Sequence, residues 1–117
     1  MRIVIDMQGA QTESRFRGIG RYTLGFVRGV IQNRGDHEII LALSGLLPDS
    51  IATIRAAFRD ILPTHAIRVW YPPGPVAATH GEGEWREPAE LIREAFLLSL
   101  KPDVIHICSL FGGYVDD

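Results

Sequence analysis

The sequence holds one cysteine, little net charge and no long apolar run, and each of these absences excludes a class of protein. Cys108 on its own can form neither an internal disulfide nor a cysteine-rich zinc site. The formal net charge of −2 gives no basic surplus for binding nucleic acid. No apolar run approaches the roughly 18 residues of a membrane span, and the opening MRIVID is too short for a signal-peptide core. These absences indicate a cytoplasmic protein with no nucleic-acid partner.

Familiar cofactor motifs are absent as well. The segment Gly18-x-Gly20-x-x-Thr23 is close to the dinucleotide fingerprint, but it does not follow the first apolar run directly, and no acidic residue ends the second run. No Gly-Lys-Ser/Thr occurs, which excludes a phosphate-binding P-loop. The histidines outside the apolar runs show no metal-ligand spacing; they are His37, His65 and His80. We therefore expect no metal and no resident cofactor.

What the sequence does contain is a regular alternation of short apolar runs and helical patterns. The apolar runs predict four strands, at residues 3–5, 39–43, 67–70 and 103–108. Because they lack strict apolar-polar alternation, they are typical of strands buried on both faces. The 117 residues allow one domain with a real core.

The three segments between the runs carry the 3.6-residue apolar period of amphipathic helices. The first helix is predicted from Ile19 to Ile31, with Gly35 as the left-handed residue of its stop. The second is predicted to begin with Pro48 in its first turn and to end before Pro63. The third is predicted to follow Glu87-Pro88, and its inward residues are expected to be Leu91, Ile92, Ala95, Phe96 and Leu98.

The alternation predicts an α/β fold, a Rossmann-like parallel sheet with right-handed crossovers and helices on both faces. With strand order 3-2-1-4, the strand order reverses between the first and fourth strands, where such sheets bind ligands. The loops there are residues 8–17 and 109–117, and a third loop at residues 71–84 is rich in proline and glycine. No helical pattern follows the fourth strand to cover it. We expect a longer protein, or else a partner, to cover that face.

Candidate site residues follow from this placement. Gly18 and Gly20 open the first predicted helix, whose free N–H groups favour a phosphate, and the arginines that would add donors are Arg15, Arg17 and Arg21. Alternatively, the glycines only permit a tight turn and close packing. Asp6 ends the first strand and either orients a ligand hydroxyl or caps loop N–H groups. The last loop adds further cleft candidates, Ser109, Gly112 and Gly113, unless these glycines only make a flexible chain end.

Two side chains of the fourth strand are ambiguous. His106 could act as a base, although a structural role against a helix is the simpler interpretation. Cys108 has no evident base partner and is interpreted as a buried, inert thiol. Trp70 and Trp85 are interpreted as packing residues rather than as platforms for sugar rings.

Three segments form a recognisable series along the chain: MRIVIDMQGAQTESRFRGIGRYTLGFVRGV, NRGDHEIILALSG and LKPDVIHICSLFGG. Their most specific parts are Arg17-Gly18-Ile19-Gly20-Arg21-Tyr22 and Lys101-Pro102-Asp103-Val104-Ile105-His106. In order and spacing these segments resemble the N-terminal part of family 4 glycosyltransferases of the GT-B type, and mannosyltransferase-like bacterial enzymes in particular. The resemblance covers nearly the whole chain.

The resemblance implies that residues 1–117 form an acceptor-side Rossmann-like domain that faces a C-terminal donor domain of the full-length protein. The family transfers a sugar with retention of configuration and without a metal. Here the implied donor is a nucleotide sugar such as GDP-mannose, and the acceptor is a glycan or lipid-linked glycan of surface polysaccharide synthesis. Gly18 and Gly20 would reach the donor diphosphate, helped by Arg17 or Arg21. The paired glutamates of the family belong to the C-terminal domain, and its loop histidine after the fourth strand is absent here, so no catalytic residue is carried over.

Two other functions stay open. The chain can be a stand-alone α/β interaction module that dimerises through exposed edges, or a flavodoxin-like or nucleotide-binding enzyme. The first predicts a stable dimer without affinity for diphosphate, and the second predicts a chromophore or nucleotide bound after purification. If the glycosyltransferase interpretation holds, residues 1–117 alone are predicted to be inactive, because both sides of the cleft must position the substrates. Peripheral attachment to the inner face of the membrane is also compatible with the sequence.

Overall fold

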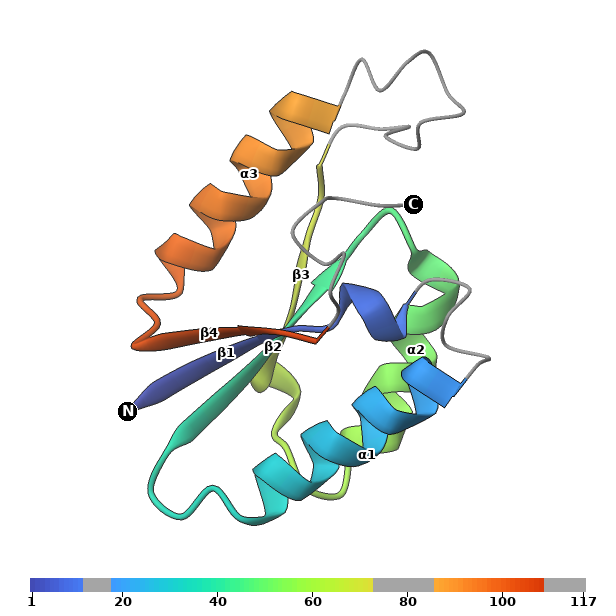
Figure 1. Cartoon of the computed structure of the whole chain (residues 1–117), viewed down its shortest axis with the longest axis vertical. Coiled ribbons are helices and arrows are strands. Elements are labelled where there is room, and N and C mark those ends of the chain that lie inside the picture. The colour runs from blue at the N-terminus through green and yellow to red at the C-terminus, as the bar shows by residue number, and fades with distance from the viewer. Residues whose placement is uncertain (12–17, 73–85, 109–117) are drawn as a thin grey trace.

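A computed structural model of the chain describes residues 1–11, 18–72 and 86–108. Strands and helices alternate along it (Figure 1), in the order predicted. The strands are β1 (Arg2–Asp6), β2 (Glu38–Ser44), β3 (Ile67–Trp70) and β4 (Val104–Ile107). The α-helices are α1 (Gly18–Gln32), α2 (Pro48–Phe58) and α3 (Arg86–Ser99), with short 3-10 helices η1 (Gln8–Ala10) and η3 (Thr64–Ala66).

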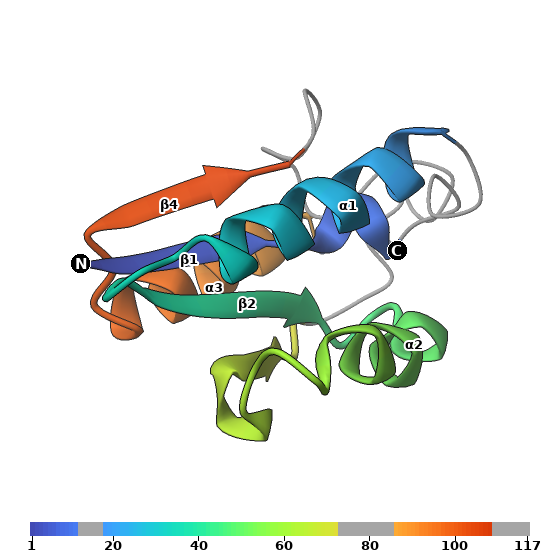
Figure 2. The ribbon, with the colours of Figure 1, turned by 90° about the horizontal axis from the view of Figure 1, so that it is seen from below.

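The four strands form one parallel sheet in the order β3-β2-β1-β4, which confirms the predicted topology. β1 lies between β2 and β4, so that Ile5 pairs with Leu41 on one side and with His106 on the other. Figure 2 shows β4, β1 and β2 side by side and pointing the same way, with β4 at the outside. The carboxyl ends of β1 and β4 are therefore neighbours, as a switch point requires.

Helices cover both faces of the sheet, with α1 and α2 on one side and α3 on the other (Figure 1). The larger core lies under α1 and α2, where Ile5, Leu41 and Leu43 of the sheet meet Val27, Ile54 and Phe58 of the two helices. A smaller core lies under α3 and contains Val4, Ile40, Ala42, Leu97 and Leu100. This alternation along β1 and β2 fixes which face each strand residue belongs to.

Two local features confirm the predicted helix boundaries and one corrects them. Gly35 has a φ of 58°, the left-handed conformation expected after α1. Pro48 is the first residue of α2, as predicted. However, α2 ends at Phe58 and not near Pro63, because the N–H groups of Ile61 and Leu62 both donate to the Phe58 carbonyl, at 3.1 and 2.9 Å. This turn closes the helix and still packs Ile61 against the core.

The inward face predicted for α3 is wrong for most of its residues. Leu91, Ile92, Ala95 and Leu98 are exposed, and only Phe96 is half-buried. The buried face consists of Ala89, Arg93, Leu97 and, just beyond the helix, Leu100. The helix is rotated because Arg93 is directed into the sheet, where a carboxylate binds it.

The strand β4 also differs from its prediction, because all four of its residues are exposed. The other strands of the sheet have buried residues, and β1 and β2 are covered on both faces. Val104 and His106 lie on the face of α1, and Ile105 and Ile107 on the face of α3, because they pair with Ile3 to Asp6 in register. The expected absence of cover over β4 thus holds within the described residues.

Candidate functional site

The candidate site lies where the strand order reverses, at the carboxyl ends of β1 and β4. Asp6, the last residue of β1, pairs in register with Ile107 of β4. One residue further on, the Met7 N–H donates a hydrogen bond to the Ala42 carbonyl of β2, at 2.9 Å, so the pairing of β1 with β2 extends past Asp6. The chain then enters η1, so that the first predicted site loop begins directly at this edge of the sheet.

Asp6 forms a buried ion pair with Arg93 of α3. One carboxylate oxygen, Oδ2, accepts from Nε and Nη2 of Arg93 at 2.8 and 2.6 Å. The other oxygen, Oδ1, accepts from the main-chain N–H of Gln8 at 2.9 Å. The side chains of Arg93 and Asp6 are only 5% and 2% exposed. Of the two roles predicted for Asp6, the structure therefore shows the capping role, and its ligand contact remains a prediction.

Gln11 fixes the far end of the same turn. Its side-chain oxygen accepts from the Ser44 N–H at 2.7 Å, and its Nε2 donates to the Ser44 carbonyl at 3.0 Å. Nε2 also lies 3.1 Å from the Ser50 hydroxyl at the start of α2. The amide thus pairs with the end of β2 as another strand would, and it is fully buried. The main chain from Asp6 to Gln11 is consequently held at both ends.

The glycines predicted to contact an anion lie at the start of α1. Gly18 is the first residue of this helix and Gly20 is buried in its first turn, while Arg21 is exposed beside it. A helix N-terminus offers free N–H groups and a positive dipole end, and α1 has no acidic residue in its first turn. Five further predicted residues lie outside the described part of the chain: Arg15, Arg17, Ser109, Gly112 and Gly113. Anion binding by this group remains a prediction.

The fourth strand brings two more predicted residues to the same region. His106 is exposed, and its ring lies 5.3 Å from the ring of Phe26 on α1, which in turn stacks on Tyr22 at 6.3 Å. Its contact with a helix agrees with a structural role, although the ring is not buried. Cys108 is half-buried, and burial, followed by the charge of Asp6, raises the pKa of its thiol to about 11. This pKa agrees with the interpretation of an inert thiol.

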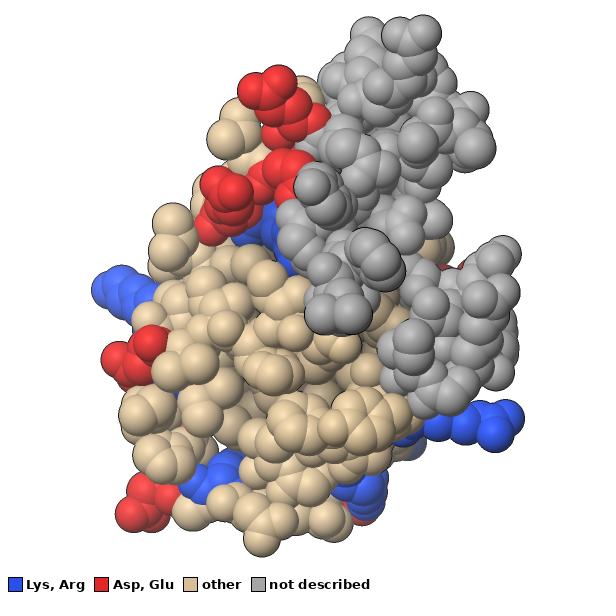
Figure 3. Space-filling model, in the orientation of Figure 1, with Lys and Arg blue, Asp and Glu red and all other residues tan. Residues whose placement is uncertain are grey.

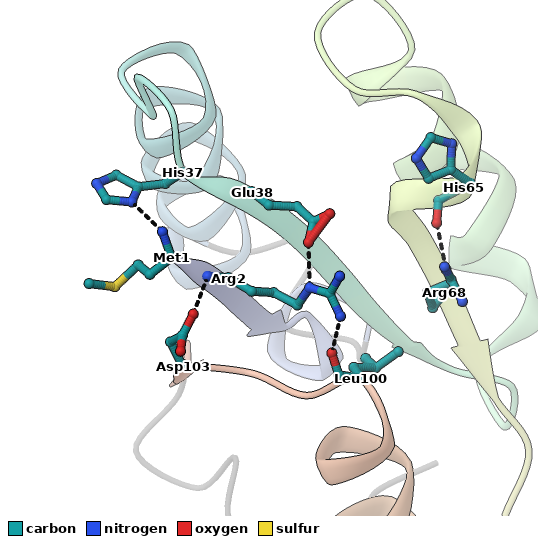
Figure 4. Close-up of polar contacts among 8 residues, drawn as sticks. All are labelled: Met1, Arg2, His37, Glu38, His65, Arg68, Leu100 and Asp103. Carbon is teal, nitrogen blue, oxygen red and sulfur yellow. Dashed lines mark hydrogen bonds and ion pairs between the residues drawn. The ribbon is translucent and has the colours of Figure 1, made fainter.

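The opposite end of the sheet contains a cleft of about 650 Å³, in which the side chains of Arg2, Arg34 and Arg68 bond to the protein itself. Arg2 donates to the Glu38 carboxylate and to the Leu100 carbonyl beyond α3 (Figure 4). The Arg2 N–H donates to the Asp103 carboxylate at 2.6 Å. Helix C-termini gather at this end of a parallel sheet, and cations there balance their dipoles. The candidate site at the carboxyl ends of β1 and β4 rests on the position of the switch point.

Two residues of the site, Arg93 and Gln11, were not predicted from the sequence. Arg93 had a signal, because it occupies the helical stripe of Ala89, Leu97 and Leu100, and a charged residue in an apolar stripe requires a buried partner. Gln11 had none, because a polar residue in a polar loop does not reveal that its amide will pair with a strand end.

The described residues were searched for clusters of metal ligands and for membrane-spanning helices. Within residues 1–11, 18–72 and 86–108, no three histidine, cysteine, aspartate or glutamate residues gather as metal ligands. Among the helices of the same segments, none is both long and apolar enough to span a membrane.

The fold defines a Rossmann-like α/β domain whose switch point lies between β1 and β4.

Comparison with known proteins finds relatives of this chain among bacterial mannosyltransferases. The chain is homologous to part of a serotype-specific mannosyltransferase WbdA of Escherichia coli. The identity is 35% over an alignment 118 residues long, which covers 99% of this chain and 14% of that protein. Two more E. coli proteins of that description are 29% and 24% identical over 91 residues, and the chain spans 11% of each. No family model and no solved structure matches the chain. The homology confirms the predicted resemblance to a mannosyltransferase.

Proposed function

We propose that this chain is the acceptor-side domain of a retaining GT-B glycosyltransferase of family 4. The whole enzyme would transfer mannose from GDP-mannose to a glycan or lipid-linked acceptor in surface polysaccharide synthesis. A second, C-terminal domain of the same protein would hold the nucleotide. The proposal places the enzyme in the cytoplasm or at the inner face of the membrane, and it assigns no metal to the reaction.

One observation carries the proposal: homology to a mannosyltransferase extends over 99% of the chain. The relative is about seven times as long as this chain, since the match covers 14% of it, and this favours a domain within a larger enzyme. The topology agrees, because a crevice at the switch point is where open α/β sheets bind ligands.

The described residues suggest how this domain would serve the reaction. The N–H groups at the start of α1, with Gly18 and Gly20, would approach the diphosphate of the donor across the cleft. Arg21, exposed in the same turn, would add a charge-assisted donor. The turn from Asp6 to Gln11 would hold the preceding main chain in place, which lowers the entropic cost of aligning donor and acceptor.

A second candidate function rests on the exposure of β4, whose four residues are uncovered in the described part of the chain. An apolar edge strand can pair with another chain. The alternative is therefore an interaction module without catalysis. It predicts a stable dimer of residues 1–117 and no measurable affinity for a nucleotide diphosphate.

The experiment that tests the proposal measures GDP release from GDP-mannose by the full-length protein, with residues 1–117 alone assayed in parallel. We expect turnover only from the full-length protein. Gly20→Val, at a buried position in the first turn of α1, should raise the KM for GDP-mannose by roughly tenfold or more, because a valine side chain there displaces the turn whose N–H groups are proposed to bind the diphosphate. Gly25→Ala is the matched control, because nothing lies within 4 Å of a Cβ added there. Turnover by residues 1–117 alone, or equal KM values in both variants, would contradict the proposal.

A further inference from the structure

The proposed donor site poses an electrostatic problem at the end of β1. A diphosphate carries negative charge, and the strand that ends at the crevice ends in a carboxylate, that of Asp6. Asp6 is 2% exposed, so water screens its charge poorly. The raised pKa of Cys108, to which the charge of Asp6 contributes, indicates that this carboxylate acts on groups at the end of β4. An uncompensated charge there would repel the donor.

Arg93 donates two hydrogen bonds to one oxygen of Asp6 from α3, on the face of the sheet opposite α1 and α2. Its Nε and Nη2 lie 2.8 and 2.6 Å from the same oxygen, and the guanidinium is 5% exposed. Glu90 lies one turn earlier on α3, and its Oε2 is 3.6 Å from Nη1 of Arg93, so a second carboxylate holds the guanidinium in place. Because Arg93 occupies Oδ2, Oδ1 remains directed at the Gln8 N–H, at 2.9 Å. The ion pair therefore fixes the geometry of the turn as well as its charge.

We propose that Arg93 is a positioning residue for donor binding: it neutralises Asp6 at the crevice and holds it as the acceptor that shapes the turn before α1. This inference rests on the proposed function, and it adds a residue on α3 that lies outside the glycine-bearing segment. It predicts that the charge of Asp6, and not its size or hydrogen bonding alone, decides how tightly the nucleotide sugar binds once Arg93 is removed.

The test uses the full-length protein with GDP-mannose, and wild-type turnover is measured first. At pH 8, Arg93→Gln should raise the KM for GDP-mannose by about tenfold while kcat changes by less than about threefold, because the charge acts on binding of the anion. The double variant Asp6→Asn with Arg93→Gln should return the KM to within about threefold of wild type, since both charges are gone. Arg59→Gln, an exposed arginine after α2, is the control and should change neither constant.

The double variant separates charge compensation from a structural role. The described groups that face the pair are Glu90 on α3 and Cys108, and the double variant retains both of them. A KM that stays about tenfold above wild type in the double variant would assign the effect to the lost packing of the Arg93 side chain and overturn the proposal.

The kinetic results can overturn the role of Arg93 without overturning the proposed function. If Arg93→Gln does not fold, Arg93→Lys decides, since it keeps a positive charge beside Asp6 and should leave the KM within about threefold of wild type. A KM for Arg93→Lys raised about as much as that expected for Arg93→Gln would overturn charge compensation and leave the glycosyltransferase proposal standing. A folded Arg93→Gln with unchanged KM would do the same. Absence of turnover by the wild-type protein would overturn both.

Discussion

At the scale of single residues, Asp6 shows how one carboxylate at a strand end serves several neighbours. It accepts hydrogen bonds from α3 and from the following turn, and its charge also acts on Cys108 of the adjacent strand end. A buried carboxylate is tolerated only when it is paired and hydrogen-bonded, and both oxygens of Asp6 meet this condition. Breaking such a pair by removing one partner leaves an uncompensated buried charge and commonly costs about 3–5 kcal/mol.

The thiol of Cys108 gives a prediction at this scale. Its pKa rises from 9.0 to about 11, first because burial disfavours the thiolate and second because Asp6 repels it. Since the thiolate is the reactive form, the native protein at pH 8 should react with a disulfide reagent roughly a hundredfold more slowly than the same protein in denaturant. Asp6→Asn should accelerate the native reaction. Equal rates in native and denatured protein would contradict this prediction.

The same shift has a consequence for stability, with a definite sign. The folded state binds the thiol proton more tightly than the unfolded state, because its pKa is the higher one. The contribution of Cys108 to stability is therefore complete below pH 9 and is lost as the pH rises toward 11. Urea unfolding at pH 8 and pH 10 should show a lower free energy at pH 10, and Cys108→Ala should reduce this difference.

At the scale of elements, two adjacent leucines of α3 test which face of the helix is buried, because one is in the core and the other is exposed. Leu97 is 5% exposed and packs with Val4 and Ile40, whereas Leu98 is 67% exposed. Leu97→Ala should lower the free energy of unfolding by about 2–4 kcal/mol, because it leaves a cavity in the core. Leu98→Ala should change it by less than about 0.5 kcal/mol, since both residues favour helix and no core contact is lost. Urea titrations of the two variants measure this, and a larger loss for Leu98→Ala would support the face predicted from sequence alone.

The same helix shows where sequence reasoning succeeds and where it fails. Strand positions followed from runs such as residues 39–43, because an apolar run of that length between helical patterns has few alternatives to a strand of a parallel sheet. The strand order was only assumed, and the structure has the order that was assumed. The face of α3 did not follow, because the helix has apolar residues on more than one side and the buried face is selected by Arg93. An ion pair between residues 87 positions apart leaves no local pattern. For the same reason the site could be placed at a sheet edge, while its buried partners could not be named.

At the scale of the whole molecule, the cover of the sheet is uneven. Figure 3 shows mainly uncharged side chains on the face over β4 and α1. Val104, Ile105 and Ile107 are between 38% and 44% exposed, and Ile105 and Ile107 line a groove of about 400 Å³ with Leu97 and Leu98 of α3. A right-handed crossover from β4 would place the next helix over this groove. The proposed function predicts that a helix of the full-length protein occupies this groove.

Hydrogen exchange of the β4 amides tests this view of the whole molecule. In residues 1–117, the amides of residues 104–107 that point away from β1 should exchange rapidly, because β4 is the outer strand of the described sheet. In the full-length protein a further strand and helix should slow them by roughly a hundredfold or more, since they then open only with the domain. The amides of β2 are the internal control, because this strand is already enclosed by β1 and β3 and should be slow in both proteins. Equally fast exchange of β4 in the full-length protein would show that β4 remains an edge, and the interaction module would then become the better account of its apolar face.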